Sequence, residues 1–147
     1  MESKGSRRGD MSRSWTGLIG RAVLVVDDHD DSRQLLRMML TAHGASVFTA
    51  ASVATARLAL AEQLPDVLIT DLAMPIEDGY GLLDYCRQHP DARLQTLPIV
   101  ALTGYGNQQA AERVLAAGFD AFVAKPVEPL EIGRIVSDLL RRRDGAS

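Results

Sequence analysis

Two hydrophobic periodicities alternate along most of this chain. Short runs of apolar residues are each followed by a longer segment in which apolar residues recur at helical spacing. The short runs, which predict strands, are 22–26, 46–50, 67–70, 97–102 and 121–124. The longer segments, which predict helices, are 31–42, 53–63, 79–88, 107–118 and 128–142. Residues 1–20 follow neither period, and this indicates a flexible N-terminal extension.

Strands that alternate with helices predict one α/β domain built on a parallel sheet. Four of the runs are almost entirely apolar, as strands covered by helices on both faces are, whereas 46–50 is mixed, as an edge strand is. We therefore expect a folded domain over 21–143, with 1–20 as an extension and 144–147 as a short tail.

The helical spacing also predicts which side chains of segment 31–42 face the core. The residues expected to face inward are Leu35, Leu36, Met39 and Leu40, with Arg33 and Arg37 outward and Met38 as a further packing residue.

Composition narrows the class of protein. The chain of 147 residues is 46% hydrophobic and 24% charged, which is ordinary for a globular domain, and its net charge of −3 argues against a nucleic-acid binder. No apolar run reaches the roughly 20 residues of a membrane helix. The single cysteine, Cys86, excludes a disulfide within the chain and favours a core packing role in a reducing compartment. We expect a cytoplasmic protein.

Polar residues of particular kinds follow the apolar strands. Asp71 follows the run 67–70, and the other strand-end residues are Asp27, Asp28, Thr103 and Lys125. Right-handed crossovers bring the carboxyl ends of all parallel strands to one edge of the sheet, where ligands of such folds bind. These five side chains are therefore expected to meet.

Their chemistry suits a phosphoryl group. Three neighbouring carboxylates repel one another, and a hard divalent cation such as Mg²⁺, which takes oxygen ligands, relieves that repulsion. The Lys125 ammonium and the Thr103 hydroxyl could bind phosphoryl oxygens. A carboxylate among them could itself act as the nucleophile and form an aspartyl phosphate.

Four motifs in order carry a resemblance to a known family. The stretches VLVVDDHDDSR, VLITDLAMPIEDGYGLL, IVALTGY and GFDAFVAKPVEPLEI resemble the receiver domain of two-component response regulators, in particular stand-alone and hybrid-kinase receivers. The resemblance covers about residues 21–142. It implies a flavodoxin-like, five-stranded parallel sheet of order 2-1-3-4-5 with five helices on its two faces.

The resemblance also implies a role for individual residues. Asp71 would accept the phosphoryl group, Asp28 would bind Mg²⁺ directly, and Asp27 would bind it directly or through water. The backbone carbonyl of Ala73 would be a further metal ligand. His29 could add another ligand, although a solvated loop histidine is the simpler interpretation.

Further residues would bind the phosphoryl group or change conformation when it is bound. Thr103 and Lys125 would hold its oxygens, and Phe122 would be the aromatic switch that turns inward as Thr103 moves. The Lys125–Pro126 bond would be cis. Tyr105 is expected to be a surface contact residue.

The implied function is that of a switch and not of a turnover enzyme. A histidine kinase or a histidine phosphotransfer protein would donate the phosphoryl group, and the domain would catalyse only its own phosphorylation and dephosphorylation. The face formed by 107–118, 121–124 and 128–142 would be read by a protein acting in trans, without nucleic acid or membrane, and is a candidate surface for pairing two copies.

Two alternatives stay open. Asp28 is followed two residues later by Asp30, the spacing that haloacid-dehalogenase-type, Mg²⁺-dependent phosphohydrolases need between their nucleophile and second acid. The chain could also be a receiver that serves only as a binding scaffold and is never phosphorylated. The small side chain of Ala73, where many receivers carry a polar residue, leaves the lifetime of the phosphorylated state undetermined.

Overall fold

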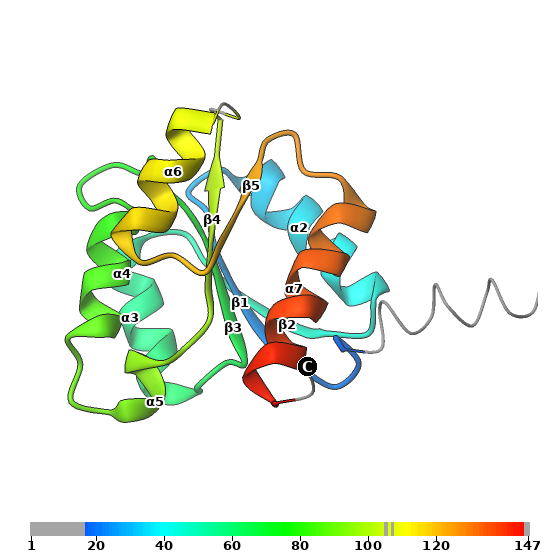
Figure 1. Ribbon diagram of the computed structural model, residues 1–147, viewed down its shortest axis with the longest axis horizontal. Helices are drawn as coiled ribbons and strands as arrows, with labels where there is room; N and C mark the ends of the chain where they lie inside the picture. The colour runs from blue at the N-terminus through cyan, green and yellow to red at the C-terminus, as the bar shows by residue number, and fades with distance from the viewer. Residues whose placement is uncertain (1–16, 105, 107, 146–147) are drawn as a thin grey trace, which may run out of the picture.

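The computed structural model describes residues 17–104, 106 and 108–145 of the chain (Figure 1). Its strands are β1 (Ala22–Val26), β2 (Ser46–Ala50), β3 (Val67–Asp71), β4 (Ile99–Thr103) and β5 (Ala121–Ala124). Its helices are α2 (Asp30–Ala42), α3 (Val53–Glu62), α4 (Gly79–Arg87), α5 (Ala92–Gln95), α6 (Gln108–Ala117) and α7 (Pro129–Arg143).

The five strands form one parallel sheet of order β2-β1-β3-β4-β5. This confirms the predicted flavodoxin-like topology. The mixed strand β2 lies at an edge, whereas β3 and β4 are buried along their whole length. The nearly continuous apolar sequences of β3 and β4 are thus explained by their central position in the sheet, because a central strand meets helices on both faces.

Helices cover the two faces of the sheet in separate layers (Figure 1). Alternate residues of each strand point to opposite faces. In β1, Leu24 and Val26 belong to the core under α3 and α4, while Val23 and Val25 pack under α2 and α7. Each helical layer therefore packs on its own hydrophobic core. The loops at the carboxyl ends of the strands remain available to carry a functional site.

One short helix was not predicted. Helix α5 follows a turn after α4, and the Asp91 side chain caps it by accepting a hydrogen bond from the backbone N–H of Arg93. Only Leu94 of its four residues is buried. A helix of a single turn is too short to display a 3.6-residue period, so hydrophobic spacing could not have found it.

The inward face of α2 is narrower than predicted. Leu36 and Leu40 are buried, but Leu35 is 52% exposed and Met38 is 66% exposed. The expectation that both pack in the core was wrong. Residues at i and i+4 form one stripe along a helix, and a helix lying on one face of a sheet buries little more than that stripe.

The structure also shows how apolar residues near the N-terminus and Cys86 of α4 lie relative to the hydrophobic core. Leu18 is fully buried in the core under α2 and α7, whereas Ile19 is exposed and Trp15 lies outside the described residues. Cys86 is buried against α3 and the sheet, as expected of a packing residue, and this burial raises the pKa of its thiol to about 11. Within the described part of the chain, no helix combines the length and apolarity needed to cross a membrane.

Candidate functional site

The parallel ladder brings the strand-end residues to one edge of the sheet. Asp71 ends β3 and lies opposite Leu102, and Thr103 ends β4 opposite Ala124. Lys125 follows directly, with its backbone N–H donating to the carbonyl of Thr103 at 2.8 Å. Residues more than twenty positions apart therefore become neighbours because adjacent parallel strands end in register.

A single ammonium group lies between two carboxylates at this edge. The Nζ of Lys125 is 3.1 Å from Oδ2 of Asp71 and 3.4 Å from Oδ2 of Asp27. Asp27 is fully buried and the Asp71 side chain is only 7% exposed. Water therefore screens these charges weakly, and each contact is stronger than a surface ion pair.

The acids form a cluster that suits a cation. Oxygen or nitrogen atoms of Asp27, Asp28, His29 and Asp71 all lie within 4.8 Å of one another. Oδ1 of Asp28 is buried and has no hydrogen-bond partner among the described residues. Since a buried carboxylate oxygen without a hydrogen bond, beside two further acids, is a suitable donor for a hard cation, the residues present fit Mg²⁺.

His29 lies at the rim of this cluster. Its side chain is 69% exposed, and Nδ1 is 3.5 Å from Asp27 and 3.4 Å from Asp28. Its backbone N–H donates to Oδ1 of Asp27 at 3.0 Å. The loop position expected for His29 is observed, and its ring is nevertheless close enough to interact with both acids.

Burial and neighbouring charges set the protonation of the central pair. Burial raises the pKa of Asp71 above its usual value, although its hydrogen bond and attraction to Lys125 and a hydrogen bond from the backbone of Ala73 work in the opposite direction. Burial disfavours the ammonium of Lys125, but the charges of Asp27 and Asp71 outweigh it and the pKa of Lys125 is raised. Lys125 is therefore protonated and positively charged at neutral pH.

Glycine at position 79 allows the start of α4 to pack closely against Asp71. A Cβ atom on Gly79 would overlap the backbone carbonyl oxygen of Asp71 and lie 3.1 Å from the Cα of Leu72. The N–H of Gly79 donates to the Leu72 carbonyl at 3.0 Å, and Asp78 caps α4 through the N–H of Gly81 at 3.1 Å. The first turn of α4 is thereby packed directly against the end of β3.

Arg33 is a site residue that the sequence analysis missed. It was expected to point outward, but its Nη1 donates to the backbone carbonyl of Asp27 at 2.9 Å, and its Nη2 pairs with Asp30. It fixes the turn between β1 and α2 that presents the acids. Its position in the first turn of α2 could have indicated this contact, because helical side chains tilt toward the helix N-terminus and an arginine there can reach back to the strand end.

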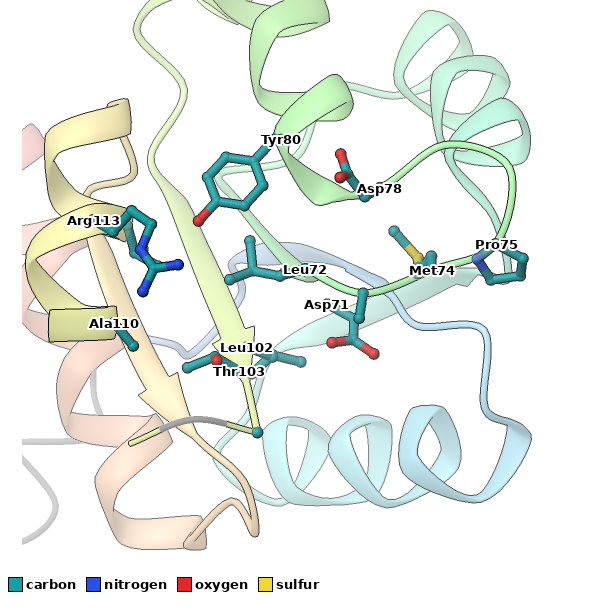
Figure 2. A pocket seen from close by; sticks show the side chains of 13 residues that line it. Asp71, Leu72, Met74, Pro75, Asp78, Tyr80, Leu102, Thr103, Ala110 and Arg113 are labelled. Atoms are coloured by element: carbon teal, nitrogen blue, oxygen red, sulfur yellow. The ribbon is translucent and has the colours of Figure 1, made fainter. Parts of the chain in front are cut away.

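A cleft opens beside Asp71 and Thr103 between α4 and α6 (Figure 2). Its volume is about 760 Å³, and Thr103 is buried in its wall. Figure 2 shows Tyr80 and Arg113 facing each other across the far end. The cleft leaves space next to the Asp71 carboxylate.

The structure also describes three of the remaining predicted positions. Phe122 on β5 is partly buried and packs against the core under α4. The Lys125–Pro126 peptide bond is cis, as expected. Ala73 is exposed at the start of the loop after β3. Tyr105 lies outside the described residues.

Comparison with known proteins points to one family. Residues 23–137 match the family model described as the response regulator receiver domain. The response regulator Rre1 of Synechocystis is 37% identical over 127 residues, which cover 86% of this chain and 54% of that protein. The chain thus spans about half the length of this relative.

Solved structures agree with the sequence relatives. A putative response regulator from Chloroflexus aurantiacus J-10-fl has a TM-score of 0.78 and 38% identity, covering 84% of this chain and 99% of that one. The receiver domain of the sensor histidine kinase PA1611 from Pseudomonas aeruginosa PAO1 has a TM-score of 0.74 and 28% identity, covering 82% and 98%. That structure has a magnesium ion coordinated in its active site cleft.

Proposed function

Because the chain belongs to the response regulator receiver family of two-component signalling, we propose that it is a phosphorylation-dependent switch whose phosphoacceptor is Asp71. One observation carries the proposal: the Asp71 carboxylate lies within an acidic cluster and 3.1 Å from Nζ of Lys125. Receivers are signalling domains, and the only chemistry proposed for this one is its own phosphorylation and dephosphorylation.

The phosphoryl group comes from a phosphohistidine of a histidine kinase or a histidine phosphotransfer protein. A carboxylate oxygen of Asp71 attacks the phosphorus, the P–N bond breaks, and its electron pair returns to the imidazole nitrogen of the donor. Lys125 and the Thr103 hydroxyl bind the transferred oxygens. Positioning and charge neutralisation are the main requirements of such a transfer.

The proposed ligands of Mg²⁺ are the carboxylates of Asp27, Asp28 and Asp71 and the backbone carbonyl of Ala73. When bound, the ion would neutralise negative charge at the phosphoryl group. Support comes from the mutual proximity of the acids and from the buried Asp28 oxygen described above. The magnesium ion in the PA1611 receiver supports the same choice of cation. The exposed ring of His29 is not needed for this ligand set.

Phosphorylation is read out on a distant face. Thr103 moves toward the phosphoryl group, Phe122 turns inward, and the surface formed by α6, β5 and α7 changes its affinity for a partner protein. A ligand or modification shifts such an equilibrium only if the partner distinguishes the two states. Exposed apolar side chains on two of these elements, Leu115 of α6 and Leu130 of α7, support a protein partner acting in trans or a second copy of the chain.

The domain division and the location of the protein are also proposals. We place a receiver domain at 21–143 between an extension, 1–20, whose Leu18 packs into the core of that domain, and a tail, 144–147. We place the signalling in the cytoplasm, where a reducing environment keeps the thiol of Cys86 free.

Labelling with acetyl phosphate and Mg²⁺ tests the proposal. Wild-type protein should take up at most one phosphoryl group per chain, and Asp71→Asn should take up none. Asp78→Asn is the matched control, because Asp78 lines the same cleft but caps α4. Labelling that persists in Asp71→Asn would refute the acceptor assignment. Repeated turnover of an aryl phosphate would favour the phosphohydrolase, and a wild type without any response to beryllofluoride would favour the scaffold.

A further inference from the structure

The loop between β3 and α4 contains a strained turn. The N–H of Glu77 donates to the carbonyl of Pro75 at 2.7 Å and closes a three-residue turn around Ile76, whose φ is 72°. A β-branched residue seldom adopts positive φ, because its Cβ crowds the backbone. The Ile76 side chain is fully exposed, so its own packing does not hold the turn. Other contacts must hold it in this conformation.

Arg57 supplies the first of these contacts. Its Nη2 forms an ion pair with a carboxylate oxygen of Glu77, and its guanidinium lies over the ring of Tyr85, 5.2 Å from the centroid. Arg57 belongs to α3 and Tyr85 to α4. The loop is therefore tied through Glu77 to an arginine that is itself held between two helices.

Glu77 is also enclosed on its other side. A Cβ atom on Gly81 would lie 2.9 Å from Oε2 of Glu77, so the glutamate lies directly against the first turn of α4. The side chains of Arg57 and Glu77 are 37% and 35% exposed, which is intermediate between a surface pair and a buried pair. A larger residue at position 81 would displace the carboxylate from Arg57.

The other end of this loop touches the acceptor. The backbone of Ala73 lies close enough to the Asp71 carboxylate to lower its pKa, and the Ala73 carbonyl is a proposed ligand of the cation. Displacement of the turn at Ile76, three residues later, would therefore change the geometry of the site itself.

We propose that Arg57 and Glu77 are positioning residues for the phosphorylation site: their ion pair holds the strained turn at Ile76 and thereby orients Ala73 toward the acidic cluster. The role assigned to Ala73 rests on the proposed function. The pair touches neither the acids nor the transferred group, and it acts through the loop.

The Mg²⁺ affinities of two single variants distinguish a positioning role of the Arg57–Glu77 pair from a long-range electrostatic effect of the two charges. Glu77→Gln removes a negative charge and Arg57→Gln a positive one, so their long-range effects on a bound cation have opposite signs. A positioning role predicts that both variants bind Mg²⁺ less tightly, by about tenfold, as outer-shell changes at metal sites do. The double variant should be no weaker than the weaker single variant, because one interaction is removed in each case. Affinity is measured by NMR titration with MgCl₂.

A rescue variant and a metal-free measurement complete the test. Glycine adopts positive φ without strain, so Ile76→Gly added to Glu77→Gln should restore most of the lost affinity. Without metal, the amide of residue 77 should exchange its hydrogen faster in Glu77→Gln than in wild type. Asp138→Asn, which breaks the Arg141 pair on α7, is the control and should change neither readout.

Several results would overturn the proposal. Affinity changes of opposite sign in Arg57→Gln and Glu77→Gln would leave only a charge effect. Unchanged amide exchange in Glu77→Gln, with circular dichroism showing a folded protein, would mean that the ion pair does not hold the turn. If wild-type protein binds no Mg²⁺, the proposed function fails instead, and the exchange measurement still decides whether the pair holds the loop.

Discussion

Lys125 and Asp71, which are separated by 54 positions in the sequence, meet at 3.1 Å between Nζ and Oδ2 at the carboxyl edge of the sheet. Nζ of Lys125 also lies 3.4 Å from Oδ2 of Asp27. One ammonium group thus partly compensates two buried carboxylates. The compensation is incomplete, because the pKa of Asp71 is still raised. An incompletely neutralised acid cluster is stabilised by any further positive charge that it can bind, and this is the physical basis of the proposed cation site.

Asp71→Asn should make the unphosphorylated protein more stable at neutral pH. The folded-state pKa of Asp71 is raised, so the stability that this group contributes is full below the ordinary aspartate pKa of about 3.9 and is lost as pH rises through the folded-state value. Removing the charge should therefore raise the free energy of unfolding at pH 7. The gain should vanish near pH 3. Urea unfolding at both pH values measures it, with the exposed Asp84→Asn as the control.

Lys125→Gln should raise the pKa of Asp71 further. The hydrogen bond and the charge of Lys125 both lower that pKa, so their removal leaves burial and the charge of Asp27 with less opposition. A carbon-detected NMR titration of the Asp71 carboxyl measures the change. A pKa that stays constant or falls in this variant would show that Lys125 does not stabilise the carboxylate, and would weaken its proposed role at the phosphoryl group.

Gly79→Ala should destabilise the domain and disturb the site together. The new methyl group would overlap the Asp71 carbonyl oxygen, and overpacking of this kind costs about 1–3 kcal/mol. Gly104→Ala, at the end of β4, is the matched control, because nothing lies within 4 Å of its added Cβ. Thermal unfolding of both variants should separate them clearly. Equal stability would mean that the end of β3 can shift away without loss.

Thr103→Ala should separate phosphorylation from its readout. Asp71 and Lys125 are unchanged in this variant, so labelling by acetyl phosphate should continue, although more slowly. The hydroxyl proposed to draw the strand end toward the phosphoryl group is missing, so hydrogen exchange in α6 and β5 should respond to beryllofluoride less than in wild type. Thr103→Ser keeps the hydroxyl and should respond as wild type does. A full response in Thr103→Ala would contradict the switch role of Thr103.

Leu36→Ala and Leu35→Ala should differ strongly although the residues are neighbours on α2. Leu36 is buried in the core and its truncation should cost about 2–5 kcal/mol, whereas Leu35 is half exposed and its truncation should cost less than about 0.5 kcal/mol. Chemical denaturation of the two variants measures the difference. Similar losses would indicate that the exposed side of α2 is covered by some other part of the chain.

Local patterns were sufficient to predict most of the fold. The nearly continuous apolar runs at β1, β3 and β4 identify strands covered on both faces, and the mixed composition of β2 identifies an edge. Right-handed crossovers then bring Asp27, Asp71 and Thr103 to a common edge without any knowledge of coordinates. Burial of Cys86 likewise follows from its place in an amphipathic helix.

Other features depend on the distances between segments, which no local pattern contains. The single-turn helix α5 and the exposure of Leu35 were not foreseen, because helical spacing gives a period but not the width of the surface that a neighbour covers. The contact of Arg33 with the Asp27 carbonyl and the ion pair of Arg57 with Glu77 are also tertiary.

The sequence by itself therefore determined which chemical groups stand at the ends of the strands, because periodicity and connection handedness are local rules. Only the tertiary structure decided how closely those groups approach, how far water is excluded from them, and which arginines hold the loops that carry them. Charge interactions depend on separation and burial, and both are fixed only when the two helical layers have packed onto the sheet.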